Sequence, residues 1–279
     1  MTLRQRVLSA SQVSVFRRCS LQWHLRYQCG VRMKPPAVLL KGRAVHAAVA
    51  AGYRSKIDSG GAQPALDLMT DAASAEWDKA APFTAFAEGE QPGDLKDRAV
   101  RLTAMHHRAI MPHVEPVLVE EEVRYSLGGV QMLGYVDCLS ADGTVRDVKV
   151  AGRRPDENGL AVDFQLAGYC AGVEAQGIPV RKIALDHLVD LKTPVVEITE
   201  LDRADVDVAR AASVAQTIAH QMATQQVVPT DDVRVCGYCE FQKMCWGQRW
   251  ERYVQEPVNA MDAARKIMPE ALLPPDAPR

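Results

Sequence analysis

Residues 134–149 read GYVDCLSADGTVRDVK, and the rest of the sequence is best understood by working outward from them. Strand-forming residues on both sides of an Ala-Asp-Gly turn predict a β-hairpin. Asp137 lies in the first predicted strand and Asp147 in the second. Lys149 follows two residues later, so its side chain points to the same face as that of Asp147. Two carboxylates and an ammonium on one sheet surface predict a site for a divalent cation and the anion that it activates.

The same short pattern also fits an ordinary ion pair between Asp147 and Lys149 on a solvent-exposed strand face. An aspartate followed two residues later by a lysine is common, so the motif alone does not decide between the two interpretations. The residues that accompany it along the chain decide.

Length and composition place the chain among globular proteins. Its 279 residues suffice for one large domain or two small ones, and 47% hydrophobic with 24% charged residues is ordinary for that class. We find no apolar run long enough to span a bilayer and no signal peptide, so we expect a cytoplasmic protein without a membrane partner. In that compartment the seven cysteines are expected to be thiols or metal ligands rather than disulfides.

Charge is distributed unevenly along the chain. Residues 1–57 hold eleven of the 33 Lys and Arg and none of the 35 Asp and Glu, which leaves 22 basic and 35 acidic residues in the remainder, a net charge of −13. This asymmetry predicts an electropositive surface for a polyanion. The alternative is that the basic segment only neutralises the acidic remainder of the chain.

Hydrophobic periodicity and turn residues predict alternating helical and extended segments around the hairpin. A short helix capped by serine is expected over 9–23, and a second helix carries His46 among small residues after Lys41. Further helices are predicted at 64–80, 93–114, 162–175 and 202–225, and strands at 117–127, 130–140, 144–150 and 181–189. The three consecutive strands predict an antiparallel meander.

The cysteines near the end of the chain form a C-x2-C-x5-C pattern made by Cys236, Cys239 and Cys245. Three thiolates need a fourth ligand, and Cys19 is the best candidate. Zinc or an iron–sulfur cluster would accept four thiolates. The other three cysteines, Cys29, Cys138 and Cys170, are expected to be structural.

Taken in order, these features resemble the iron–sulfur nucleases of the PD-(D/E)xK superfamily, which include the RecB-like and AddB-like nuclease domains and the related CRISPR-associated exonucleases. The resemblance extends over nearly the whole chain. It rests on Cys19, a Gly-Arg-x-x-His segment ending at His46, Gly134-Tyr135-Val136-Asp137, Asp147-Val148-Lys149, Gln165-x-x-x-Tyr169, and the three late cysteines.

The resemblance implies an α/β fold with a restriction-endonuclease-like core, in which helices flank a mixed sheet. It also implies a helical insertion and an iron–sulfur staple that joins the N- and C-terminal segments. We therefore expect a single nuclease domain over 1–268, followed by a disordered tail at 269–279. Within it we expect a basic segment with the first cysteine at 1–57, the insertion at 58–115, the catalytic core at 116–190, and a helix with the cysteine-rich segment at 191–268.

The resemblance also implies roles for individual residues. His46, Asp137, Asp147 and the Val148 carbonyl would hold Mg²⁺ or Mn²⁺, and Lys149 would orient and activate the attacking water. Gln165 and Tyr169 would position the DNA or buttress the site. Cys19, Cys236, Cys239 and Cys245 would hold a [4Fe–4S] cluster. The family often has glutamate at the position of Asp147. The acidic run 120–122 is expected to form an exposed strand face, with the alternative that it contributes another acid to the site.

The expected function is that of a metal-dependent DNA nuclease, an exonuclease that hydrolyses phosphodiester bonds in DNA repair, recombination or related processing. Its expected substrate is single-stranded DNA or DNA with ends. The sequence has no Walker A motif, which leaves three alternatives: the protein works alone, beside a separate helicase, or with a recombination or CRISPR-adaptation partner. Two alternatives stay open: a non-catalytic DNA-binding or scaffold subunit, and a zinc-stapled protein-interaction module.

Overall fold

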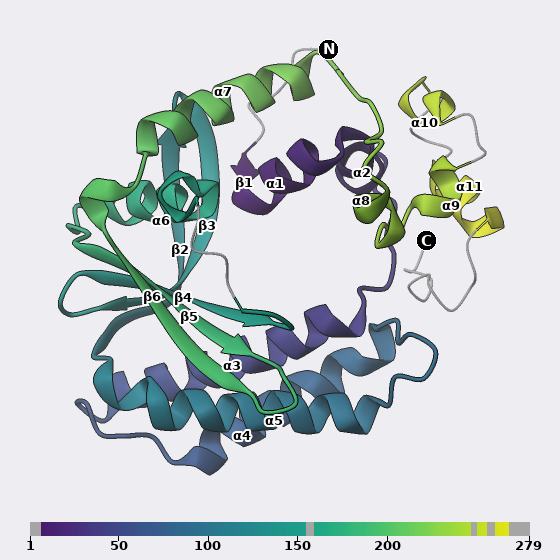
Figure 1. The fold of residues 1–279 in the computed structure, drawn as a ribbon. Coiled ribbons are helices and arrows are strands. Elements are labelled where there is room, and N and C mark those ends of the chain that lie inside the picture. Colours follow the sequence, from purple (N-terminus) through teal and green to yellow (C-terminus); the bar gives the residue numbers. More distant parts are fainter. Residues whose placement is uncertain (1–6, 155–158, 247–249, 256–259, 268–279) are drawn as a thin grey trace. The chain divides into compact units, whose positions relative to one another are not determined.

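The computed structural model describes residues 7–154, 159–246, 250–255 and 260–267 (Figure 1). The chain divides into two compact units, which are described separately. The first, called the cysteine unit, comprises residues 1–34, 127–132 and 212–279, and the second, called the sheet unit, comprises residues 35–126 and 133–211. The expectation of a single domain over 1–268 stays a prediction, and the predicted tail at 269–279 lies outside the described residues.

The sheet unit is built on a mixed β-sheet flanked by helices, as predicted. Strands β3, β4, β5 and β6 lie side by side in that order, and β2 also pairs with β3. The β3–β4 and β5–β6 pairs are antiparallel, whereas β4 and β5 are parallel. The strands are β2 (Pro116–Leu127), β3 (Val130–Ser140), β4 (Thr144–Ala151), β5 (Lys182–Val189) and β6 (Val195–Asp202).

The hairpin predicted at residues 134–149 is present as β3 and β4. Its register pairs Cys138 with Arg146 and Leu139 with Val145. Gly143 in the connecting turn has a φ of +84°, a left-handed conformation that glycine adopts without strain. The turn residues thus fix the register that places Asp137 and Asp147 on adjacent strands.

Strand β6 is absent from the sequence prediction, which is wrong at this point. Residues 195–202 pair along their whole length with β5, from Val189 opposite Val195 to Lys182 opposite Asp202. The helix predicted to begin at residue 202 instead begins later, as α7 (Val208–Ala223). Long-range pairing with β5 therefore decides the conformation of this segment.

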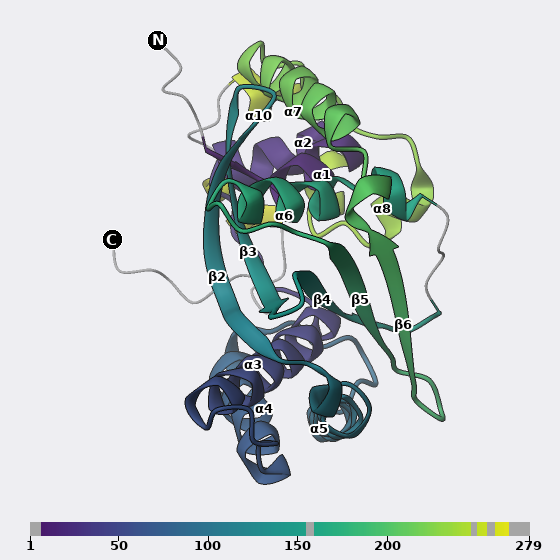
Figure 2. The same ribbon diagram turned by 90° about the vertical axis from the view of Figure 1, so that its left-hand side faces the viewer.

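Helices cover both faces of this sheet (Figure 2). On one face, α3 (Ala37–Asp58), α4 (Leu66–Ala80) and α5 (Pro92–Ala109) share an apolar core with Cys138, Val148 and Leu188 of the strands. On the other face lies α6 (Phe164–Glu174). A Cβ at its Gly168 would collide with the Tyr125 hydroxyl, so the glycine allows α6 to approach β2 closely.

The cysteine unit joins segments from both ends of the chain. Leu21 and Leu25 share a buried core with Phe241, Met244 and Tyr253. The elements described here are β1 (Leu8–Ser9), α1 (Ala10–Arg18), α2 (Ser20–Trp23), a π-helical turn (His24–Gln28), α8 (Val233–Gly237), α9 (Gln242–Cys245), α10 (Glu251–Gln255) and α11 (Ala260–Ile267). Short 3₁₀ turns elsewhere are Ala81–Phe83, Met111–His113, Leu160–Val162 and Arg203–Asp205.

The helix predicted over 9–23 is interrupted at Cys19, which corrects the sequence prediction. Ser9 caps α1 as expected, with its side chain accepting from the Gln12 N–H. Cys19 has extended backbone angles and separates α1 from α2, and its Sγ accepts from the Gln22 N–H at 3.4 Å. The cysteine therefore lies at a helix junction, where its thiol is not confined to one helical face.

None of the helices within the described residues is long and apolar enough to cross a membrane.

Candidate active site

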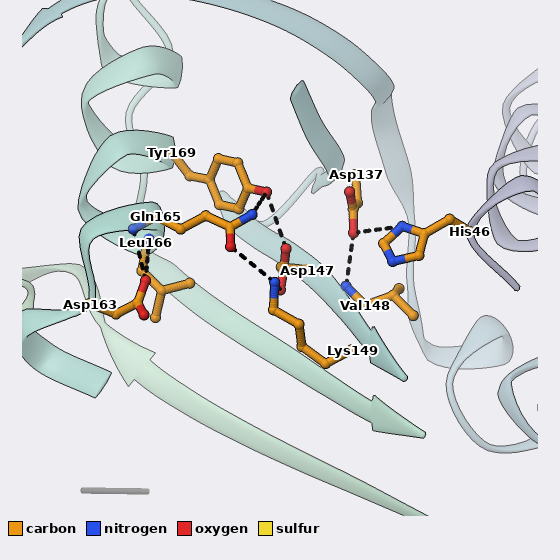
Figure 3. A network of polar contacts seen from close by, with 9 residues as sticks. All are labelled: His46, Asp137, Asp147, Val148, Lys149, Asp163, Gln165, Leu166 and Tyr169. Carbon is orange, nitrogen blue, oxygen red and sulfur yellow. Dashed lines mark hydrogen bonds and ion pairs between the residues drawn. The ribbon is translucent and has the colours of Figure 1, made fainter. Parts of the chain in front are cut away.

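Asp137 is held at the point where the β3–β4 hairpin opens. Its Oδ2 accepts from the Val148 N–H at 2.9 Å, so a carboxylate occupies the position that a strand carbonyl would otherwise take (Figure 3). A backbone donor in a sheet needs an acceptor, and Asp137 supplies it. The bond fixes this carboxylate against β4.

His46 reaches the same carboxylate from α3. Its Nδ1 lies 3.3 Å from Asp137 Oδ2, and its side chain is one-third exposed. Burial would lower the pKa of His46, but the hydrogen bond and charge of Asp137 outweigh it and raise that pKa. The structure thus brings His46 of α3 and Asp137 of the hairpin together, whereas a role for His46 as a metal ligand stays a prediction.

Glu120 on β2 also belongs to this site, although an exposed strand face was expected for residues 120–122. One ligand atom each from His46, Glu120 and Asp137 lie within 4.8 Å of one another. Glu120 is half-buried, and burial together with the negative charge of Asp137 raises its pKa. Its φ of +52° departs from the strand conformation. Regular alternation cannot predict that departure, and the sequence offers no signal for it.

Asp147 lies beside this group and is only 1% exposed. Tyr169 Oη donates to its Oδ1 at 3.1 Å, and Lys149 Nζ lies 2.7 Å from its Oδ2. Oδ2 therefore faces the Lys149 ammonium, and it has no other hydrogen-bond partner among the described residues. Burial raises the pKa of Asp147 to about 6, although Lys149 acts in the opposite direction. An additional positive charge nearby would stabilise the ionised form of this buried carboxylate.

Gln165 and Tyr169 stand one turn apart on α6 and complete a ring of polar contacts with Asp147 and Lys149. Gln165 Oε1 accepts from Lys149 Nζ at 3.1 Å, and its Nε2 donates to Tyr169 Oη. Asp163 caps the helix by accepting from the backbone N–H groups of Gln165 and Leu166. These contacts favour the interpretation that Gln165 and Tyr169 buttress the site.

The structure thus gathers most of the predicted residues, in two adjoining groups. His46 and Asp137 lie with Glu120, whereas Asp147 is outside that 4.8 Å group and contacts Lys149 and Tyr169. Val148 contributes its N–H, and a role for its carbonyl stays a prediction. The arrangement has the carboxylates, imidazole and ammonium that metal-assisted hydrolysis requires.

Part of the predicted basic surface is neutralised within each unit. In the sheet unit Arg43 pairs with Glu76, and in the cysteine unit Arg26 pairs with Glu240. Arg17, Arg18 and Arg32 have exposed side chains. Those three are therefore the better candidates for contact with a polyanion.

The four cysteines predicted as cluster ligands lie around one pocket of the cysteine unit. Cys19, Cys236, Cys239 and Cys245 all line it. Within the described chain, no three of their sulfurs lie within 4.8 Å of one another, so a closed coordination shell is not seen. Of the other cysteines, Cys138 and Cys170 are fully buried in the sheet unit, and the Cys29 thiol donates to the Tyr253 carbonyl at 3.5 Å.

Comparison with known proteins gives a family and a fold. A family model described as the PD-(D/E)XK nuclease superfamily matches residues 7–246. The crystal structure of a "Putative exonuclease" from Eubacterium rectale is similar, with a TM-score of 0.56 at 14% identity, covering 85% of this chain and 86% of that one. The crystal structure of SSO0001 covers 63% of this chain and 75% of that one at 18% identity. Its TM-score of 0.34 is too low to indicate a shared fold. No curated protein matches the chain.

Proposed function

Because the chain belongs to the PD-(D/E)XK nuclease superfamily, we propose that it is a divalent-metal-dependent deoxyribonuclease. We propose further that it is an exonuclease acting on DNA ends or single strands in repair, recombination or related processing. The observation that carries the proposal is the convergence of Asp137, Asp147 and Lys149 on one sheet surface.

The donor set fits a divalent cation. Asp137, Asp147, His46 and the Val148 carbonyl would hold Mg²⁺ or Mn²⁺, and the buried Oδ2 of Asp147 has no hydrogen-bond partner within the described residues. A bound cation would lower the pKa of a coordinated water from 15.7 toward about 7 and neutralise charge on the phosphate. The imidazole of His46 favours Mn²⁺ more than an all-oxygen set would.

Lys149 is the group positioned to act on the phosphate and the attacking water. Its ammonium is held between Asp147 Oδ2 and Gln165 Oε1, and its side chain is about 39% exposed, so the charged end reaches solvent. A fixed positive charge at this position would stabilise the negative charge that accumulates on the phosphate oxygens in the transition state. Gln165 and Tyr169 would keep the ammonium and the carboxylate oriented during that step.

Digestion of end-labelled DNA tests the proposal. Wild-type protein should release mononucleotides or short products from single- or double-stranded ends with Mg²⁺ or Mn²⁺, and chelator should stop the reaction. Asp137→Ala should abolish cleavage, whereas Asp142→Ala in the exposed turn of the same hairpin should keep it. Equal cleavage by Asp137→Ala and wild type would refute the assignment of this hairpin as the active site.

We also propose that Cys19, Cys236, Cys239 and Cys245 hold a [4Fe–4S] cluster that joins the two ends of the chain. Two observations support it: all four line one pocket, and their segments share a core. Four thiolates on one zinc at about 2.3 Å would lie about 3.8 Å apart. A [4Fe–4S] cluster differs from a single zinc ion in that each thiolate would bind its own iron atom.

The partners follow from this proposed activity. DNA is the proposed substrate, and the exposed arginines of the cysteine unit would contact its phosphates. A separate helicase, or a recombination or CRISPR-adaptation protein, would supply ends or strands, since the sequence has no Walker A motif. Co-purification with tagged protein, followed by a nuclease assay with the recovered partner, tests this part.

A further inference from the structure

We propose that Glu120 is a further direct ligand of the divalent cation, beside His46 and Asp137. This inference rests on the proposed nuclease function. It adds Glu120 to the ligands that the family resemblance implied, which were His46, Asp137, Asp147 and the Val148 carbonyl.

The three groups have the chemistry and spacing of an incipient coordination shell. They offer one imidazole nitrogen and two carboxylate oxygens, all within 4.8 Å of one another. Ligands at about 2.1 Å from one ion lie at most about 4.2 Å apart, so shifts of a few tenths of an ångström would close the shell. A mixed nitrogen and oxygen set of this kind suits Mn²⁺ and related ions.

The backbone of β2 explains why Glu120 turns toward the site. Val119 packs on the core shared with α3, α4 and α5, whereas Val123 lies close to Gly172 of α6, on the opposite face of the sheet. These two residues are four apart and would share a face in a regular strand. The positive φ of Glu120 produces this change of face and behaves as a bulge.

The neighbouring acids do not share this placement. Glu121 is exposed, and Glu122 is also exposed and accepts from the Tyr135 hydroxyl at 2.8 Å. Of these three consecutive glutamates, Glu120 therefore faces His46 and Asp137, whereas Glu121 and Glu122 are exposed. This difference supplies a matched control within the same strand.

Asp147 is the buried carboxylate next to these three groups. Its Oδ2 lies 2.7 Å from Lys149 Nζ, and its other oxygen accepts from Tyr169. The charges of Asp137 and His46 act on Asp147, so an ion bound by Glu120, His46 and Asp137 would add positive charge to the surroundings of this carboxylate.

The test measures Mn²⁺ binding in the absence of DNA, by electron paramagnetic resonance of free Mn²⁺ during titration. Glu120→Gln should weaken binding by roughly tenfold or more, because even the outer partners of metal ligands are worth about 10–100-fold in affinity. Glu121→Gln should bind within about twofold of wild type.

Thermal melting in chelator checks that each variant folds, and Glu120→Asp is the second variant if Glu120→Gln does not. Shortening the side chain by one methylene should also weaken Mn²⁺ binding.

Wild-type affinity in Glu120→Gln, or an equal loss in Glu121→Gln, would overturn the proposal. If Glu120→Gln binds Mn²⁺ normally while the wild type cuts DNA, only the ligand assignment fails. If Mn²⁺ binding is lost as expected but the wild type cuts no DNA, only the proposed function fails.

Discussion

Replacing Asp147 by asparagine should stabilise the metal-free protein while removing its proposed activity. Burial raises the pKa of Asp147 to about 6, against about 3.9 for an unfolded aspartate. Between these values the folded state binds more protons than the unfolded state, so stability falls as pH rises through this window. The two-unit difference corresponds to about 3 kcal/mol at 1.36 kcal/mol per unit. Asparagine resembles the neutral acid in shape and carries no charge, so it avoids this cost.

Chemical denaturation in chelator at pH 7.5 and pH 4 provides the measurement. Asp147→Asn should be more stable than wild type by about 3 kcal/mol at pH 7.5, with most of the difference lost at pH 4, where the wild-type side chain is protonated. Added Mn²⁺ should reduce this difference in stability at pH 7.5, because Asp147 is a proposed ligand and the ion would stabilise the folded wild type more than the variant. An ion at 100 times its Kd stabilises the folded state by about 2.7 kcal/mol.

Asp142→Asn is the matched control, since Asp142 is exposed in the turn of the same hairpin. It should change stability by less than about 0.5 kcal/mol at either pH. The reasoning is refuted if Asp147→Asn is less stable than wild type in chelator at pH 7.5. It is also refuted if the difference between the two proteins is the same at pH 4 and pH 7.5.

Three further predictions concern the proposed chemistry, the cluster and the DNA contacts. Lys149→Ala should lower kcat by ~10²–10³ with little change in KM, because it removes a charge that acts mainly in the transition state. Steady-state kinetics provide the measurement, and a rise in KM with kcat unchanged would contradict this role. Anaerobically purified protein should be brown with absorbance near ~400 nm; Cys19→Ala should lose that colour and Cys170→Ala should keep it, whereas stoichiometric zinc in a colourless preparation would contradict the cluster. Reversing the charges of Arg17 and Arg18 should weaken DNA binding across sequences and flatten its salt dependence in fluorescence anisotropy, and a salt-independent affinity in the wild type would argue that these charges do not contact phosphate.

Local patterns in the sequence were enough to predict the hairpin and one face of the site. Alternation along β4 places Asp147 and Lys149 on one face, and the i, i+4 spacing places Gln165 and Tyr169 on one side of α6. The Asp-Gly turn fixes which two strands pair. Each of these features depends on residues within a few positions of one another. A short stretch of sequence is therefore enough to show the periodicity of a strand or helix.

Contacts between distant segments were decided only by the tertiary structure. Strand β6 forms because it pairs with β5, and the ring of contacts between α6 and β4 gives Gln165 and Tyr169 their partners. The left-handed φ of Glu120 brings a second acid to His46 and Asp137. Glutamate has no special preference for that conformation, so no local pattern announces it. The sequence by itself determined which side chains share a face of each strand or helix, whereas only packing determined which faces meet, because that depends on burial and pairing across the whole chain.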